Sequence, residues 1–304
     1  MTLIAILGAT GHIGRALAHH YAGRPDVELE LYSRRPDASR HFSGEDPHDA
    51  RVRHLSLDDL DGCRPDILVN AIGIGDPAKA RQAGPAFYDL TMEIEDRIDR
   101  IAYHHRSCLT VFMSSGAIYG RFDDGPADDD TPASLPINSL EPGDWYAAAK
   151  LAAEMRHRAQ PDRRILDIRV FGFVSPFLNL STEYLVCDVV NSIKGGTVMR
   201  TNPGDITRDY VGAPELASII DAGARHRAIN LAVDTYSREP VSKFALLESL
   251  RRFGLEWHVD SDQSALTRSH YWSRYRGAGK IDYTPERRSI DIVGEVVAEL
   301  VRLR

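Results

Sequence analysis

The chain has 304 residues, 43% of them hydrophobic and 27% charged, which is typical of a globular protein with one large α/β domain and room for a smaller lobe. A formal net charge of −7 gives no general attraction to nucleic acid or anionic membranes, so neither is expected as a partner. The sequence has no transmembrane stretch or signal-peptide pattern, and its three cysteines have no CxxC spacing. We therefore expect a cytoplasmic protein with reduced thiols and no metal site.

The N-terminus is an apolar run over residues 2–7 that stops at the sequence GATGHIG. A buried strand, a glycine-rich turn and a helix together present backbone N–H groups and a helix dipole to a pyrophosphate. Gly8 permits the turn, Gly11 lets the backbone approach phosphate, and Gly14 lets the helix pack closely. The alternative is a glycine turn that only ends a strand. The cofactor-binding residues expected here are Gly8, Thr10, Gly11, His12, Ile13 and Gly14.

Strands and helices alternate through the first half of the chain. After the first strand, further strands are predicted over residues 27–32, 51–55, 66–71, 108–113 and 165–171, with helices over 86–105 and 146–159. Repeated β-α-β units indicate a doubly wound parallel sheet, with ligands at the carboxyl ends of its strands. Asn70 and Ala71 end one strand and are expected to contact the cofactor. The polar stretch 35–49 is predicted to be a surface loop, and 121–143 a loop over the site.

The pattern is looser beyond residue 171. Helices are predicted over residues 182–193, 214–224 and 241–253, and strands over 198–202 and 228–233. We expect residues 1–171 to form a dinucleotide-binding domain, with contributions from about 205–234, and residues 172–304 to form mainly a substrate-binding lobe.

Two motifs have the residue types needed for acid–base chemistry. In YAAAK, Tyr146 and Lys150 lie four residues apart on one helix face, where the ammonium favours the phenolate. The alternative is a solvated lysine beside a half-buried tyrosine. In SSGAIYG, Ser114 and Ser115 end a central strand, where a hydroxyl can hydrogen-bond a substrate oxygen while the tyrosine moves its proton.

GATGHIG, SSGAIYG and YAAAK occur here in the order seen in the extended short-chain dehydrogenase/reductases, the NAD(P)-dependent nucleotide-sugar epimerase/dehydratase family, which the chain resembles. RVFG, TRDYV and INLA extend the resemblance through later segments. The resemblance implies a Rossmann-type fold, a homodimer and a catalytic triad of Ser115, Tyr146 and Lys150. It also implies that Lys150 binds the nicotinamide ribose, with Ser114 as the alternative catalytic hydroxyl.

The resemblance further implies that Arg208 binds the diphosphate of a nucleotide sugar; the alternative is a surface arginine paired with Asp209. The substrate-binding residues expected are Ser114, Ser115, Asn179 and Arg208. The chain departs from the family pattern in having Gly172 where an asparagine is common. It also has Gly116 and Ala117 in place of the Asp-Glu pair of sugar dehydratases, which argues against dehydration.

The end of the second strand bears on the choice of cofactor. NAD-specific proteins have an acidic residue there for the ribose 2′-hydroxyl, whereas this chain has Ser33, Arg34 and Arg35. Arginines attract the 2′-phosphate of NADP, so NADP is favoured, with NAD possible and loop charges without a role as the alternative. We therefore expect an NADP(H)-dependent reductase of a keto group on a nucleotide sugar. The alternatives are a nucleotide-sugar C4 epimerase and a reductase of a non-sugar carbonyl.

Overall fold

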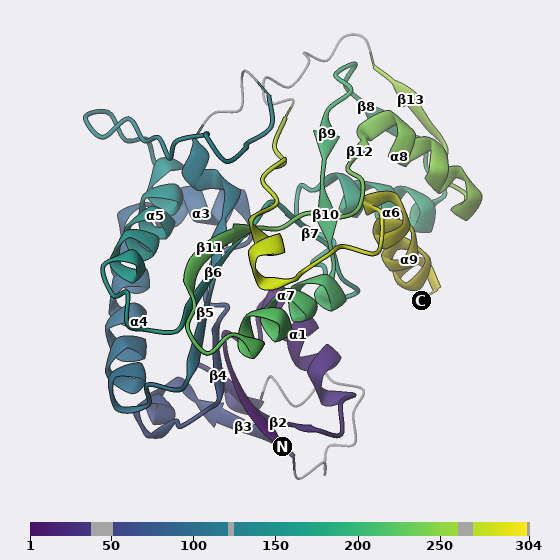
Figure 1. Ribbon diagram of the computed structural model, residues 1–304. Coiled ribbons are helices and arrows are strands. Elements are labelled where there is room, and N and C mark those ends of the chain that lie inside the picture. The colour runs from purple at the N-terminus through teal and green to yellow at the C-terminus, as the bar shows by residue number, and fades with distance from the viewer. Residues whose placement is uncertain (38–50, 121–124, 261–269, 303–304) are drawn as a thin grey trace.

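The computed structural model describes residues 1–37, 51–120, 125–260 and 270–302 (Figure 1). A seven-stranded parallel sheet lies at its centre, in the order β11-β6-β5-β4-β1-β2-β3. Its strands are β1 (Thr2–Leu7), β2 (Val27–Ser33), β3 (Val52–Ser56), β4 (Ile67–Asn70), β5 (Leu109–Ser115), β6 (Ile165–Val170) and β11 (Asn230–Asp234). The sheet confirms the predicted α/β Rossmann-type fold. Most of the stretch 35–49, expected to be a surface loop, lies outside the described residues.

Helices cover both faces of the sheet, and the central strands β1, β4 and β5 are accordingly largely buried. In β1, Ile4 and Ile6 pack toward α1 (His12–Ala22) and α7 (Ala213–Arg225). Ala5 and Leu7 point to the opposite face, where the core includes residues of α4. The bounds of α4 are Pro85–His104, and α5 (Asp144–Arg158) lies beside it on this face (Figure 1).

The strand order reverses direction at β1, which pairs with β2 on one side and β4 on the other. The connections after β1 and β4 therefore leave toward opposite faces and open a crevice at the carboxyl ends of the strands. Ser115, one of the residues predicted to act in catalysis, lies at this edge because it ends β5, which pairs with β4.

The later part of the chain has a second apolar core, formed by residues such as Val189, Leu247 and Val293. In the described part of the chain, the region around this core has three helices and three two-stranded pairs, which lie at the carboxyl end of the sheet (Figure 1). The helices are α6 (Leu185–Gly195), α8 (Lys243–Leu250) and α9 (Ser289–Arg302). The strand pairs are β7 (Gly172–Phe173) with β10 (Tyr210–Val211), β8 (Met199–Thr201) with β13 (Trp257–Val259), and β9 (Thr207–Arg208) with β12 (Val241–Ser242). Among the described residues, no helix has the length and apolar character needed to span a membrane.

Several elements differ from the sequence prediction, among them the short strands of the later part of the chain and three helices. The helix expected over residues 241–253 begins only at Lys243, because the two residues before it pair with β9 and the Ser242 hydroxyl caps the helix. It ends in a 3₁₀ turn, η3 (Arg251–Phe253). Helix α3 (Pro77–Ala83) and helix α9 were not predicted. α3 has no apolar stripe, whereas α9 has a clear one that the sequence analysis did not use.

Candidate active site

The glycine turn after β1 has the close approaches that its sequence predicts. Gly8 has a φ of +76°, and its N–H donates to the carbonyl of Tyr32 in β2 at 3.0 Å. A Cβ on Gly14 would lie 2.3 Å from the Gly8 carbonyl oxygen, so only glycine allows this packing. Helix α1 begins at His12 without a side-chain cap, and the turn residues Thr10 to Ile13 line the cavity. The first amides of α1 are thus available to an anion.

His12 gives the turn a neutral side chain. Its ring packs edge-on against Phe173, with the centroids 4.8 Å apart, and its Nε2 is buried without a hydrogen-bond partner among the described residues. Burial, together with the smaller effect of the neighbouring Arg15 charge, lowers the pKa of His12 to about 4. At neutral pH the imidazole therefore has one N–H to donate and no charge.

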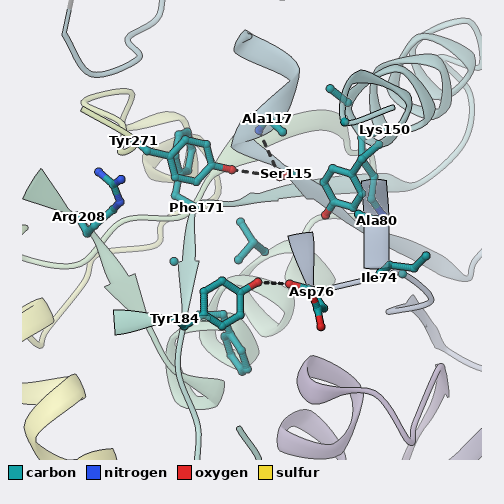
Figure 2. A pocket seen from close by; sticks show the side chains of 18 of the residues that line it. Ile74, Asp76, Ala80, Ser115, Ala117, Lys150, Phe171, Tyr184, Arg208 and Tyr271 are labelled. Carbon is teal, nitrogen blue, oxygen red and sulfur yellow. Dashed lines mark hydrogen bonds between the residues drawn. The ribbon is translucent and has the colours of Figure 1, made fainter. Parts of the chain in front are cut away.

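Ser115 lies at the carboxyl end of β5, where its side chain caps a 3₁₀ turn, η2 (Gly116–Tyr119). The Ala117 N–H donates to the Ser115 Oγ at 3.2 Å, and the Tyr271 phenol lies 3.2 Å from the same oxygen. Figure 2 shows both contacts, with Tyr271 reaching Ser115 from the opposite wall and Arg208 beside it.

Helix α5 brings Tyr146 and Lys150 to the same place. Lys150 is only 2% exposed, and its Nζ donates to the Met113 carbonyl oxygen at 2.8 Å. The Nζ lies 4.4 Å from the ring centroid of Phe112 and 5.8 Å from that of Tyr146. The Tyr146 ring stacks on Phe87, with centroids 5.2 Å apart and 21° between the planes. Packing therefore fixes the directions of both side chains.

The surroundings set the protonation states of the pair. Burial lowers the pKa of Lys150 to about 8, although the carboxylates of Glu95, Glu154 and Asp167 act in the opposite direction. Burial raises the pKa of Tyr146, and a hydrogen bond from Ser115 opposes this shift by stabilising the phenolate. At neutral pH the phenol keeps its proton while the amine is mostly charged.

One cavity of about 2490 Å³ joins the glycine turn to these groups. A single ligand site has roughly 300–1,000 Å³, so this cavity has room for two ligands side by side. Asn179 and Arg208 line the part formed by the later segments of the chain. The stretch predicted to be a loop over the site lines it as well, through residues between 125 and 143; residues 121–124 lie outside the described chain.

Two residues expected at the site have side chains with partners inside the protein, although Ser114 still lines the cavity. The Asn70 amide donates to Glu95 at 2.7 Å, and its oxygen accepts the Ile72 N–H, so its side chain has internal partners while Ala71 lines the cavity. The Ser114 hydroxyl donates to Glu154 at 2.5 Å. The single proton of the Ser114 hydroxyl is therefore donated to a buried carboxylate. The Ser115 hydroxyl has the Tyr271 phenol as its neighbour in the cavity instead.

The end of β2 lies next to the glycine turn, because the residue before Ser33 accepts two hydrogen bonds from that turn. Ser33 is buried, and its Oγ has no partner among the described residues. Arg34 and Arg35 are exposed.

The structure explains two departures from the family pattern. A Cβ on Gly172 would lie 2.6 Å from the Asp209 carbonyl oxygen, so the pairing of β7 with β10 has no room for the usual asparagine. A Cβ on Gly116 would lie 2.4 Å from the Phe171 ring, which fills the place where an acidic side chain would begin.

Sequence reasoning did not assign a role to two groups that contact the triad or its neighbours. Tyr271 is one of several aromatic residues in the later part of the chain, and its residue type alone does not mark it as a site residue. Glu154 was not noted, although it continues the spacing of Tyr146 and Lys150 by four more residues on the same helix face, a signal that was available.

Comparisons with known proteins identify the fold and the family of the chain. A comparison with curated proteins finds no match. Among solved structures, a UDP-N-acetylglucosamine 4-epimerase from Methanobrevibacter ruminantium has a TM-score of 0.81 at 14% identity, covering 100% of this chain and 99% of that one. A dTDP-glucose 4,6-dehydratase from Bacillus anthracis, in complex with NAD, has a TM-score of 0.78 at 14% identity and coverages of 100% and 98%. A UDP-glucuronic acid 4-epimerase from Bacillus cereus has a TM-score of 0.77 at 14% identity and coverages of 99% and 100%.

At such identities these structures establish the fold. The family follows from the sequence itself, since residues 4–236 match the model of the NAD dependent epimerase/dehydratase family. The chain therefore belongs to this family of enzymes, the extended short-chain dehydrogenase/reductases, as its motifs predict.

Proposed function

We propose that the protein is an NADP(H)-dependent oxidoreductase that reduces a keto group on a nucleotide-activated sugar. The observation that carries this proposal is the meeting of Ser115, Tyr146 and Lys150 in one cavity with the glycine turn. Ser115 can donate a hydrogen bond to the substrate oxygen, and Tyr146 can give that oxygen a proton. The Lys150 ammonium places a positive charge beside the tyrosine.

The chain's residues fit a nicotinamide dinucleotide. The backbone at Gly11 and the first amides of α1 would hold the pyrophosphate, and the close packing at Gly14 keeps that backbone accessible. His12 lines this part of the cavity with a neutral imidazole. Lys150 would hold the nicotinamide ribose, next to Ala71 at the end of β4.

The choice of NADP rests on the end of β2. A carboxylate there would repel a 2′-phosphate, and Ser33 has none. Arg34 and Arg35 follow it, are exposed, and can form charge-assisted hydrogen bonds with a phosphate.

When bound, the cofactor supplies the hydride. Tyr146 holds the proton that the substrate oxygen needs, because burial raises the pKa of its phenol. As this proton leaves, the Lys150 ammonium stabilises the phenolate. Ser115 also polarises the substrate carbonyl as a hydrogen-bond donor.

A nucleotide sugar is favoured as substrate by the size of the cavity and by Arg208. The Arg208 guanidinium lines the cavity and is matched in geometry to a diphosphate. The complexes of solved relatives contain such ligands, for example UDP-N-acetylmuramic acid in the Methanobrevibacter enzyme. Dehydration is disfavoured because Phe171 occupies the space beside Gly116.

A C4 epimerase is the second candidate, because two of the structures described above are sugar 4-epimerases of the same fold. The same triad serves oxidation followed by re-reduction. The two reactions differ in cofactor balance, which is directly measurable.

The deciding experiment supplies NADPH with a UDP-4-keto-sugar and follows both NADPH absorbance and product. Stoichiometric loss of NADPH supports the reductase. Interconversion of UDP-sugar epimers without net cofactor change refutes it in favour of the epimerase. In the same assay, Arg208→Ala should raise KM for the nucleotide sugar about tenfold, with exposed Arg225→Ala as the matched control. An unchanged KM in Arg208→Ala would remove the diphosphate contact and favour a non-sugar carbonyl substrate.

Cofactor choice is tested by the Kd values of NADPH and NADH. Arg34→Ala should weaken NADPH about tenfold and leave NADH unchanged, because only NADPH has the 2′-phosphate. Exposed Arg106→Ala, at the opposite end of the sheet, serves as the control. Equal losses for both cofactors would contradict the assignment.

We further propose a homodimer and a cytoplasmic location. The exposed apolar side chains of Leu90 on α4 and Met155 on α5 support a helix-pair interface. The three cysteines are buried free thiols, as suits a reducing compartment. Sedimentation of the protein with Met155→Glu tests the interface, and the variant should be monomeric.

A further inference from the structure

Residues 270–276, called the strap below, carry Tyr271 to the cavity. The strap is held along its backbone by the segment over the site: the Ala127 N–H donates to the Trp272 carbonyl at 3.0 Å, and the Arg274 N–H donates to the Ala127 carbonyl at 2.6 Å. These backbone hydrogen bonds fix the strap against the segment over the site, but they do not connect it to the central sheet.

A buried side chain makes that connection. Ser273 is 0% exposed, and its hydroxyl donates to Oδ2 of Asp234 at 2.5 Å. Asp234, also 0% exposed, ends β11 and accepts the Tyr119 phenol proton at 3.0 and 3.1 Å. A carboxylate this deep in the protein is costly without such donors, so Ser273 is held firmly where it lies.

The chain of hydrogen bonds continues from Asp234 to the catalytic helix. The guanidinium of Arg169 donates to the Tyr119 oxygen at 2.6 Å and to Glu154 of α5 at 2.6 Å. Glu154 in turn accepts from Ser114 at 2.5 Å. The strap, the end of β5 and the helix that carries Tyr146 and Lys150 therefore belong to one buried network.

On the cavity side, the strap contacts the end of β5 through the hydroxyl groups of Tyr271 and Ser115 (Figure 2). The Ser115 oxygen already accepts the Ala117 N–H. A phenol is a stronger acid than an alcohol, so Tyr271 is the better donor of the two hydroxyls. With two donors on its oxygen, the Ser115 O–H is left to donate toward the cavity, which Tyr146 also lines.

We propose that Tyr271 is a positioning residue for Ser115, and that Ser273 and Asp234 anchor it. Tyr271 fixes the direction in which Ser115 donates its proton, and so supports the hydrogen bond from Ser115 to the substrate oxygen that Tyr146 protonates. The assignment rests on the proposed function in that it takes Ser115 as the catalytic hydroxyl. It adds a group from the C-terminal part of the chain to the machinery of the sheet.

The test measures kcat and KM of Tyr271→Phe, Ser273→Ala and the double variant with NADPH and a UDP-4-keto-sugar. Tyr275→Phe, on the same strap but outside the cavity, is the matched control. We expect kcat to fall about tenfold in Tyr271→Phe with KM within twofold, because the lost hydrogen bond acts on the transition state. Ser273→Ala should lower kcat less, and should add nothing to Tyr271→Phe in the double variant, because it acts through that phenol.

Two results would overturn the proposal: a kcat of Tyr271→Phe equal to that of Tyr275→Phe, or fully additive losses in the double variant. Hydrogen exchange tests the anchor without any turnover. Ser273→Ala should speed exchange in peptides covering 125–128 and 270–276 and leave those of β5 unchanged. If the wild-type protein does not act on the nucleotide sugar, the proposed function fails, and the exchange result still decides the anchor. Unchanged exchange in both peptides would overturn it.

Discussion

Replacing Gly14 by alanine tests the closest approach in the glycine turn. The added Cβ would lie 2.3 Å from the Gly8 carbonyl oxygen, whereas ordinary contacts begin at 3.4 Å, so backbone must move by about 1 Å. Overpacking of this kind costs about 3 kcal/mol at its upper end, and alanine in a helix returns about 1 kcal/mol. The net loss of about 2 kcal/mol is roughly a thirtyfold change in the unfolding equilibrium.

Urea unfolding of Gly14→Ala measures this loss, and Gly23→Ala, at the C-terminal cap of the same helix, is the control. A Cβ on Gly23 would meet its nearest atom at 3.7 Å, an ordinary contact, so its stability should stay within about 0.5 kcal/mol of the wild-type value. Because the displaced Gly8 carbonyl belongs to the turn, Gly14→Ala should also weaken binding of the dinucleotide about tenfold. Stability and cofactor affinity equal to those of Gly23→Ala would refute the reasoning.

Three further predictions concern the buried charges. Tyr146→Phe should lower kcat at least a hundredfold while nucleotide binding, measured by calorimetry, is retained; full turnover would exclude the phenol as proton donor. Burial lowers the pKa of Lys150 to about 8, so kcat/KM should fall above pH 8 as the ammonium is lost, and Lys150→Arg should keep its lower rate constant to higher pH. The buried His157 ring lies 2.7 Å from Asp167 and 2.9 Å from Glu95, so His157→Gln should lower the free energy of unfolding by about 3–5 kcal/mol, and a loss under 1 kcal/mol would contradict its role as their counter-charge.

The sheet was predictable because its signals are local. The strand before Gly8 and the spacing of Ile94, Ile98 and Ile101 in α4 each follow from a period that the backbone imposes. Helix α3 has no such period, and its signals are an Asp76 cap and a proline at its first position. The predicted start of α8 was wrong because Val241 and Ser242 pair with β9, a strand distant in sequence.

The directions of side chains could not be predicted in the same way. Ser114 and Ser115 are adjacent and alike, and alternation along β5 points one to Glu154 and the other to the cavity. Asn70 ends β4 at the edge of the sheet where ligands are expected, but its amide donates to Glu95 inside the protein. These outcomes depend on partners that only the folded chain brings together.

The backbone pairing between Ala127 and Ser273 joins two covering segments that are nearly 150 residues apart in the chain. The backbone groups of each segment form hydrogen bonds with the other segment, so each segment needs the other to hold its conformation. An engineer who wishes to transfer the substrate preference of a relative to this enzyme would therefore have to transplant both pieces together. Exchanging one alone would leave the backbone donors of the other without acceptors.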